Sequence, residues 1–537
     1  MKNIAVAIAL LCFALTLSAQ EAFDFEVQLS PVAVPNLPGL HSYAFAQHNG
    51  QWLIIGGRRD GVHARQPFAS FAAASNNTDL YVIDPTQATF WKASVNALPL
   101  GLREQLQSTN MNFYQDADTL YIIGGYAFSA SANAHKTFTG LISVQVSGLI
   151  QAIKNQTDMQ PFFKQINDDI FAVTGGQLGK IGHTYYLVGG QRFDGRYNPM
   201  GPDHGPGFSQ QYTNQIRKFR LHNDGTQLSF THYEAITDPV HLRRRDYNLL
   251  PQIFPDGQQG YTISSGVFQL QADLPFLYPV DITENGYTPI TGFNQYLSNY
   301  HSAKAALYDS AANRMHSLFF GGISRYYYQN GQLIEDDQVP FVRTISLLSR
   351  SADGTLAEYQ LPTEMPGLKG AGAEFIVNRN LPHHESEIIQ LSAISSDTIL
   401  IGHIYGGILS PALNPFSANQ TGITTADASV YSVRLIRKNT ASAAQQVKGR
   451  HSFDFEVFPN PAQENVTLRY DLPYAGKVNY FLYTVDGKIL QRGEWERQTS
   501  GRNEQSLFVH RSFSAQPLFI ALAFDDQFYA VKKIVRE

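Results

Sequence analysis

Cysteine is almost absent from this chain of 537 residues. The single cysteine, Cys12, lies in an apolar run near the N-terminus, and none follows it. The chain beyond that run therefore forms no internal disulfide and has neither a thiol nucleophile nor a thiolate ligand for a metal. We expect its stability to come from packing alone.

Charged residues are also scarce, at 16% of the chain against roughly 25% in an average soluble protein. The 40 basic and 45 acidic residues give a net charge of −5, which argues against a general nucleic-acid-binding protein. Hydrophobic residues make up 43% and aromatic residues 12%, so a large core can form and global disorder is excluded. The 42 glycines and 26 prolines indicate frequent turns and no long helices.

Long apolar runs are lacking as well, apart from one at the N-terminus. Lys2 precedes an apolar stretch over residues 4–17, which ends in the small residues Ser18 and Ala19. This pattern predicts a secretory signal peptide over residues 1–20, removed before folding. The stretch is shorter than the ~18–20 residues that a membrane-spanning helix needs. No other segment reaches that length, and we expect no transmembrane span.

The chain after residue 20 holds a repeat of short strands. In its clearest copy, residues 52–57 form an apolar run that ends in a glycine pair. Residues 79–84 alternate between apolar and polar, as a half-buried strand does. After a turn at Asp84-Pro85, Phe90 and Trp91 begin a further strand. These three strands match most of a four-stranded antiparallel sheet.

Five further copies follow, each with an apolar strand that ends at glycine and a later strand that is its partner. The predicted pairs are 120–125 with 140–146, 185–190 with 215–221, 261–266 with 276–281, 318–322 with 342–348, and 400–407 with 429–435. The sixth copy lacks its last strand. We predict that residues 23–30 supply it by pairing with residues 429–436, because such closure removes a free sheet edge.

The repeat resembles the kelch family of β-propellers over residues 21–438. The resemblance is carried by Gly56-Gly57, Tyr81 and Trp91 in the first copy, and by the glycine-terminated strands of the others. It implies an all-β fold with a six-bladed kelch-like β-propeller. A bare kelch repeat has about 50 residues, so each copy carries insertions. An array of β-sandwiches is the alternative.

The C-terminal part has a different pattern. Residues 439–452 contain few large apolar residues and predict a linker that few contacts cross, before a small Ig-like β-sandwich over residues 453–537. This tail resembles the C-terminal sorting domain of the type IX secretion system of Bacteroidota. The resemblance implies a sorting signal at Pro459, Asn460, Pro461, Gly487, Lys488, Lys532 and Lys533. The chain departs from that family at residues 517–521, which lack the usual Gly-x-Tyr strand, and an ordinary Ig-like appendage is the alternative.

Arginine and aromatic residues gather in and around the long loops that follow the glycine pairs, which emerge on one face of a kelch-like propeller. We expect a ligand-binding rim at Arg58, Arg59, Tyr126, Arg192, Arg196, Arg243, Arg245, Arg325 and Tyr326. Arginine offers bidentate donors to carboxylates and phosphates, and aromatic rings stack on sugars. The alternative is that these arginines brace neighbouring blades, with Asp60, Asp194 and Asp246 as their partners.

Motifs for catalysis or metal binding are missing. His383-His384-Glu385 lacks the spacing of a zinc site, and Glu335-Asp336-Asp337 lacks that of a calcium loop. No nucleophile elbow or phosphate-binding loop is present. Copper oxidases of the kelch type need a thioether-linked cysteine, which the chain lacks after residue 20. We therefore expect no catalytic residues, no metal and no cofactor.

These patterns together predict a secreted or surface-attached propeller that binds a glycan or protein ligand. The tail implies export through the periplasm to the outer-membrane surface, with the type IX secretion machinery as partner and no nucleic acid. Two alternatives stay open: a sugar-acting enzyme resembling kelch-type sialate mutarotases, and a structural or adhesive surface protein. Arginine and carboxylate groups that converge on the central channel would favour the enzyme.

Overall fold

The computed structural model describes residues 23–198, 207–270, 272–438, 445–447, 453–485, 487–510, 513, 517–525 and 528–535. The predicted signal peptide over residues 1–20, most of the predicted linker and Asp486 lie outside these residues. In the described part, no helix has both the length and the apolar character that a membrane crossing requires.

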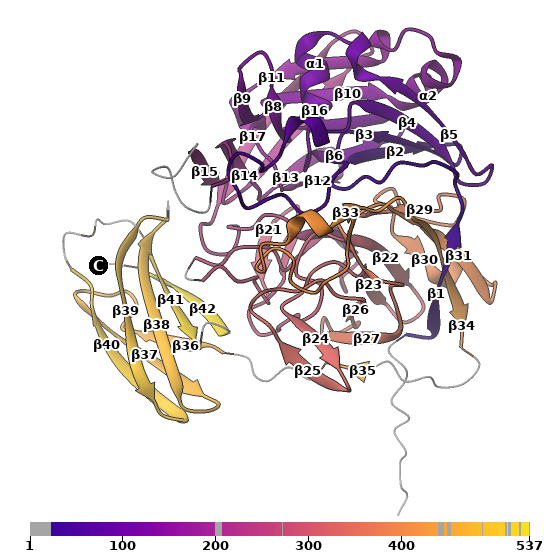
Figure 1. Cartoon of the computed structure of the whole chain (residues 1–537). Helices are drawn as coiled ribbons and strands as arrows, with labels where there is room; N and C mark the ends of the chain where they lie inside the picture. Colours follow the sequence, from indigo (N-terminus) through magenta and orange to yellow (C-terminus); the bar gives the residue numbers. More distant parts are fainter. Residues whose placement is uncertain are drawn as a thin grey trace, which may run out of the picture.

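Six antiparallel sheets, each built on four neighbouring strands, make up the chain from Phe25 to Arg437 (Figure 1). In five sheets the four strands follow one another in chain order, and in the sixth the N-terminal strand β1 takes the last place. The first strands of all six line one cavity, so the sheets surround a common centre as in a β-propeller.

The strands of the six sheets, each taken from its first to its fourth, are β2 (Ala44–His48), β3 (Gln51–Ile55), β4 (Asp79–Asp84) and β5 (Thr89–Ser94); β6 (Asn112–Asp116), β7 (Thr119–Ile123), β10 (Gly140–Gln145) and β11 (Phe163–Asn167); β12 (Gln177–Ile181), β13 (Thr184–Val188), β16 (Gln215–Asn223) and β17 (Leu228–Thr237); β18 (Asn248–Ile253), β19 (Gln259–Ser264), β20 (Val280–Thr283) and β21 (Gly286–Pro289); β22 (Ala303–Asp309), β23 (Arg314–Phe320), β26 (Thr344–Arg350) and β27 (Leu356–Glu364); and β29 (Glu374–Val377), β31 (Thr398–Tyr405), β34 (Val430–Arg437) and β1 (Phe25–Val32).

The glycine pair after the second strand marks the place where a neighbouring sheet comes close. Gly56 has a φ of +68°, and a Cβ atom there would lie 2.6 Å from the carbonyl oxygen of Ser108, which leads into the next sheet. A Cβ atom on Gly57 would lie 2.5 Å from the carbonyl oxygen of His41. No larger side chain fits at either position. The repeated pair is therefore a signature of sheet-to-sheet packing.

The predicted closure of the ring by the N-terminal segment is confirmed. Strand β1 pairs antiparallel with β34, from Phe25 opposite Arg437 to Val32 opposite Val430. Phe25 and Val27 are buried in the same core cluster as Val433 and Leu435. The first and last segments of the 25–437 region thus share one sheet, whose last strand would otherwise be missing.

The loops that follow the glycine pairs form small sheets of their own and pack on one another. Four of these loops contain β8 (Tyr126–Ser129) and β9 (Ala134–Thr137), β14 (Gln191–Gly195) and β15 (Phe208–Tyr212), β24 (Tyr326–Gln329) and β25 (Gln332–Glu335), and β32 (Ile408–Ser410) and β33 (Thr425–Ala426). β28 (Leu368–Ala371), between β27 and β29, pairs with β32. The ring of His63 lies 4.4 Å from that of Phe71, 4.9 Å from Tyr197 and 5.3 Å from Phe416. Loops of three different sheets therefore meet at this histidine.

In the described part of the chain, two α-helices interrupt the strands. α1 (Leu100–Gln105) precedes β6, and α2 (Val146–Asn155) follows β10. α2 buries Leu149, Ile150 and Ile153 against the core that the first two sheets share. Both helices are short, in keeping with the frequent glycines and prolines of the sequence.

One predicted strand is wrong in its position. The fourth copy was expected to form a strand over residues 276–281, but β20 runs from Val280 to Thr283. Pro279 has no N–H to donate to a partner strand, so the strand begins after it. Phe276 and Tyr278 are buried in the loop before it instead.

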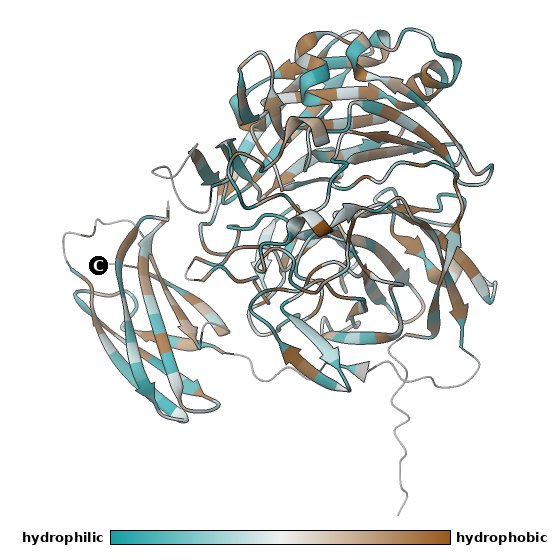
Figure 2. Ribbon diagram, viewed as in Figure 1, coloured by the Kyte–Doolittle hydropathy of each residue, from teal (hydrophilic) through white to brown (hydrophobic). Residues whose placement is uncertain are grey.

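Residues 455–534 form two further sheets that share a core. One contains β36 (Phe455–Phe458), β37 (Asn465–Leu472) and β40 (Gly501–Phe508), and the other contains β39 (Ile489–Gln498), β38 (Gly476–Thr484), β41 (Leu518–Phe524) and β42 (Phe528–Ile534). Buried residues alternate with exposed or half-buried ones along β37, and hydrophobic and hydrophilic residues are mixed along the strands of both sheets in Figure 2. Val466, Leu468 and Leu522 are among the core residues between the two sheets.

The expectation that few contacts cross the linker is wrong. Tyr483 and Tyr529 of the tail belong to the same buried cluster as Val240 and Tyr278 beside the fourth sheet. The short strand β35 (Gln445–Gln446), within the predicted linker, also pairs with β27. The tail therefore packs on the propeller through an apolar contact.

Another short strand, β30 (Ile389–Gln390), pairs parallel with β22.

Candidate functional site

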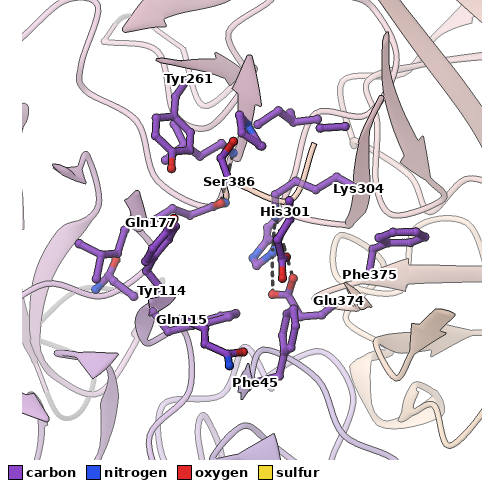
Figure 3. Close-up of a pocket in the computed structure, with 18 of the residues that line it drawn as sticks. Phe45, Tyr114, Gln115, Gln177, Tyr261, His301, Lys304, Glu374, Phe375 and Ser386 are labelled. Carbon is purple, nitrogen blue, oxygen red and sulfur yellow. Dashed lines mark hydrogen bonds and ion pairs between the residues drawn. The ribbon is translucent and has the colours of Figure 1, made fainter. Parts of the chain in front are cut away.

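The first strands of the six sheets line a cavity of about 170 Å³ (Figure 3). Each sheet contributes at least one side chain from this strand: Phe45, Tyr114, Gln177, Leu250, Lys304 and Glu374. A cavity of roughly 150 Å³ accepts a single benzene ring. The space therefore suits a ligand of about one ring.

Aromatic rings form much of the wall. Tyr261 is fixed by two hydrogen bonds with the backbone of Lys180, whose N–H donates to the hydroxyl at 2.9 Å and whose carbonyl accepts from it at 3.2 Å. Its ring lies over Gly179, where a Cβ atom would come within 2.6 Å of Cζ. Glycine in β12 thus lets a tyrosine from the next sheet lie flat against the strand. Phe45, Tyr114 and Phe375 add further ring surface.

A buried ion pair stands among these rings. His301 Nε2 lies 2.9 Å from Glu374 Oε1, and Lys304 Nζ lies 4.0 Å from Glu374 Oε2 and 3.4 Å from His301 Nε2. Burial pushes the pKa of Glu374 upward, but the charges of His301 and Lys304 and the hydrogen bond from His301 outweigh it and hold the pKa below its ordinary value. Burial lowers the pKa of Lys304, and Glu374 opposes this shift.

The loop between β29 and β30 reaches across one end of the cavity. Its residues Glu385, Ser386 and Glu387 line the space. Arg379 holds Glu387 through Nε at 2.8 Å and Nη2 at 2.6 Å, and Lys180 of the third sheet holds Glu385 at 3.0 Å. The first ion pair lies within the loop, and the second ties the loop to β12 of the third sheet.

Two uncharged polar atoms on the wall lack a hydrogen-bond partner in the described part of the chain. They are Asn112 Oδ1 and Ser386 Oγ, both buried. Asn112 is 0% exposed and uses its Nδ2 for the carbonyls of Ile123 and Val173. An unsatisfied buried acceptor costs free energy unless something donates to it. Both residues line the cavity, and each of the two atoms is almost completely covered by the surrounding protein.

The expected rim residues lie elsewhere, and none of them lines this cavity. Arg58 is 2% exposed and binds Asp60 through Nε at 2.8 Å and Nη2 at 2.5 Å. Arg192 is more exposed and pairs with Asp194 at 2.8 Å, while Arg245 pairs with Asp246. The three aspartates named as bracing partners therefore each hold one arginine.

The other rim arginines also contact groups of this chain. Arg325 is buried and pairs with Glu335 and Asp337, each at 2.7 Å. Arg243 donates to the carbonyl of Phe268 at 2.6 Å and stacks 3.9 Å above the ring of Tyr212. Arg196 donates to the carbonyl of Phe68 at 2.7 Å.

Of the remaining rim residues, Arg59 is exposed and the two tyrosines are buried. Tyr126 donates to the carbonyl of Gly195 at 2.7 Å. Tyr326 lies against Arg325, with 5.4 Å between the guanidinium carbon and the ring centre. Binding of a ligand by this rim stays a prediction.

The residues of the expected sorting signal lie between β36 and β37, in the turn between β38 and β39, and on the edge strand β42. Asn460, between Pro459 and Pro461, donates to the carbonyl of Lys533 and accepts from the N–H of Val535, both at 2.8 Å. Lys532 pairs with Asp454 at 2.9 Å. Gly487 lies beside Pro239 of the propeller, and the N–H of Lys488 donates to Thr484 Oγ1 at 3.1 Å.

Two residues of the cavity, Asp246 and Glu385, stood out in the sequence, but for other roles, and most of the others did not. Each copy is recognisable by its second, glycine-terminated strand, whereas the cavity is lined by the first strand, which has no comparable signature. A usable signal was present, since the strand before each glycine-terminated strand must face the centre. The spacing of His383 and His384 does not predict a metal site. Among the described residues, no group of three or more His, Cys, Asp or Glu side chains could hold a metal ion.

Comparison with known proteins adds weak structural likenesses. No family model and no curated protein matches the chain. The chain is similar to the structure of YjhT, with 11% identity, coverage of 77% of this chain and 100% of that one, and a TM-score of 0.41. It is also similar to a fungal alcohol oxidase of the AA5 family, with 9% identity over 96% of this chain and 100% of that one at a TM-score of 0.35.

A third similar structure is a glycoside hydrolase family 43 arabinoxylan arabinofuranohydrolase from Bacillus subtilis. The two chains share 10% identity over 94% of this chain and 99% of that one, with a TM-score of 0.27. At such scores the likenesses carry no argument about function. The propeller arrangement is established by the six sheets of this chain and the cavity they surround.

Proposed function

We propose that this chain is an exported, six-bladed kelch-like propeller that binds a sugar-sized ligand in its central cavity. The observation that carries the proposal is a one-ring cavity with aromatic walls and two buried, unpartnered polar atoms, Asn112 Oδ1 and Ser386 Oγ. Small-molecule sites combine apolar walls with a few placed polar groups in this way. A sugar presents both an apolar ring face and hydroxyl donors.

Binding is tested by calorimetric titration of residues 21–537 with a panel of monosaccharides and disaccharides. We expect one or more monosaccharides to bind, and Ser386→Ala and Tyr114→Leu to weaken that binding. Arg192→Ala, on the expected rim, is the matched control and should bind as the unaltered protein does. Loss of binding in Arg192→Ala alone would move the site to the rim, and no binding by any sugar would refute the proposal.

A sugar-acting enzyme is the second candidate, and the buried group of His301, Glu374 and Lys304 favours it. A carboxylate that orients a histidine is a common arrangement for proton transfer, and here both groups face the cavity. Such a pair could move a proton at a sugar oxygen, as the resemblance to kelch-type sialate mutarotases implies. Exchange spectroscopy by NMR would detect faster interconversion of sugar anomers, and Glu374→Gln should abolish the acceleration.

We further propose that the tail is an Ig-like sorting domain of the type IX secretion system, which takes the protein through the periplasm to the cell surface. The two-sheet sandwich, with Asn460 holding its final strand, supports this reading. The test compares surface exposure of the full chain with that of Asn460→Ala and of a chain that ends at residue 452. Equal surface exposure of all three proteins would refute the sorting role.

A further inference from the structure

We propose that the cavity selects sugars without an acidic group and binds amino sugars more tightly than neutral ones. This inference rests on the proposed sugar-binding function and names its ligand class. It follows from the charges that face the cavity, from the partners those charges already have, and from the unpartnered atoms on the wall.

Carboxylates outnumber cations on the wall. Four line the cavity, namely Asp246, Glu374, Glu385 and Glu387, against the cations Lys304 and Arg379 and the imidazole of His301. Arg245 and Lys180, which pair with Asp246 and Glu385, are not among the lining residues. A bound molecule therefore meets carboxylate oxygens more often than cationic nitrogens.

The two lining cations are already engaged. The guanidinium of Arg379 uses Nε and Nη2 on Glu387 and Nη1 on the carbonyl of Gln47 at 3.3 Å. Lys304 is held near Glu374 and His301, and burial lowers its pKa. A ligand carboxylate would thus compete with Glu387 for Arg379, and beside Lys304 it would face Glu374, a like charge in a poorly solvated place.

Glu374 is well placed to receive a cationic ligand. Its side chain is 6% exposed, and the charges around it keep its pKa below the ordinary value, so it stays ionised. Oε1 contacts His301 at 2.9 Å, whereas the one cation near Oε2 among the described residues is Lys304 at 4.0 Å, beyond hydrogen-bond distance. A ligand ammonium at Oε2 would form a charge-assisted hydrogen bond, which is stronger than one from a hydroxyl.

The remaining polar groups suit hydroxyls rather than a second charge. Asn112 Oδ1 is an acceptor without a donor, and Ser386 Oγ can donate or accept. Burial raises the pKa of Tyr114 and Tyr261, so both phenols stay neutral. An amino sugar can place its hydroxyls beside Asn112 and Ser386 on the wall and direct its ammonium to Glu374.

The test titrates residues 21–537 with glucosamine, glucose and glucuronate, which share one ring and differ in charge. We expect glucosamine to bind about tenfold more tightly than glucose, and glucuronate to bind at least about tenfold more weakly, since one charge interaction of this kind is worth about a factor of ten. Equal affinities, or tighter binding of glucuronate, would overturn the inference and leave the sugar site standing. No binding by any of the three, or by the wider panel, would overturn the proposed function itself.

A pair of variants assigns the preference to one group. Glu374→Gln should remove the advantage of glucosamine over glucose, and Glu284→Gln, the same change at an exposed position in the turn between β20 and β21, should preserve it. Because Glu374 is buried in an ion pair, the first variant is checked for folding by circular dichroism. The comparison among the three sugars on the unaltered protein does not depend on that variant.

Discussion

Substitution of Gly179 by alanine should displace the ring of Tyr261, which forms part of the cavity wall. The added Cβ atom would lie 2.6 Å from Cζ, 2.7 Å from Cε2 and 3.0 Å from Cε1 of Tyr261, all on one ring. Ordinary contacts begin near 3.4 Å, so the ring must move by roughly 1 Å. Such overpacking costs about 1–3 kcal/mol, which the better strand propensity of alanine offsets by roughly 0.5–1 kcal/mol. We expect a net loss of about 1–2 kcal/mol in the free energy of unfolding.

The ring cannot move freely, because its hydroxyl is held by the backbone of Lys180 at 2.9 and 3.2 Å. A shift therefore either breaks these hydrogen bonds or pushes the ring into the ligand space. Urea unfolding of residues 21–537 measures the loss of stability, and titration with the tightest-binding sugar measures the loss of affinity. We expect both to change together.

A double-mutant cycle with Tyr261→Leu isolates the contact. In that background Gly179→Ala should cost much less, since the ring that it strikes is gone. Gly292→Ala is the matched control, because that glycine is exposed and a Cβ atom there meets nothing within 4 Å. Unchanged stability and affinity in Gly179→Ala, or an equal cost in both backgrounds, would refute the packing argument.

Three further predictions concern the frame around the cavity. Deletion of residues 23–32 should lower the melting temperature strongly, because β34 loses its partner strand and the ring opens; a calorimetric scan that matches the full chain would contradict this. Burial raises the pKa of Glu358 from an ordinary value of 4.5 to about 8, although hydrogen bonds from two backbone N–H groups oppose this shift. Its contribution to stability is therefore complete below pH 4.5 and is lost as the pH rises through 8, and Glu358→Gln should flatten that part of the pH profile of urea unfolding. Arg58→Ala should lower the free energy of unfolding by about 2–4 kcal/mol, because it leaves Asp60 without its main partner. Arg192→Ala should lower it by less than about 1 kcal/mol, because the side chain of Arg192 is 44% exposed. Equal unfolding midpoints for the two variants would count against bracing by Arg58.

The ring of six sheets was predictable because the sequence patterns that indicate it are local. The glycine pair at Gly56-Gly57 reports a backbone approach that no other residue type allows, and it recurs at a fixed place in the sheets. The closure by β1 followed from a missing strand and a free edge. The position of β20 was mistaken because apolar residues at 276–278 read as a strand, although Pro279 prevents the pairing.

The cavity was not predictable in the same way, because its residues are brought together by the ring and not by spacing in the sequence. His301, just before β22 of the fifth sheet, and Glu374, at the start of β29 of the sixth, are 73 positions apart in the sequence, yet their side chains lie 2.9 Å apart. The loop arginines attracted attention instead, since their chemistry is visible in single segments. The structure gives each of those segments an internal partner, such as Asp60 for Arg58 and Asp194 for Arg192.

The tail also changes how the propeller should be understood. Its contact with the fourth sheet buries Tyr278 and Val240 against Tyr483 and Tyr529, on the sheet that also supplies Tyr261 to the cavity wall. A chain that ends at residue 452 would expose this apolar patch, so its loss of stability and any loss of secretion have to be measured separately. If the truncated protein melts near the temperature of the full chain and binds sugar with the same affinity, the tail contact is dispensable for the site. If affinity falls with the melting temperature, the fourth sheet carries the effect of the tail to the cavity, and Tyr261→Leu should then make affinity insensitive to truncation.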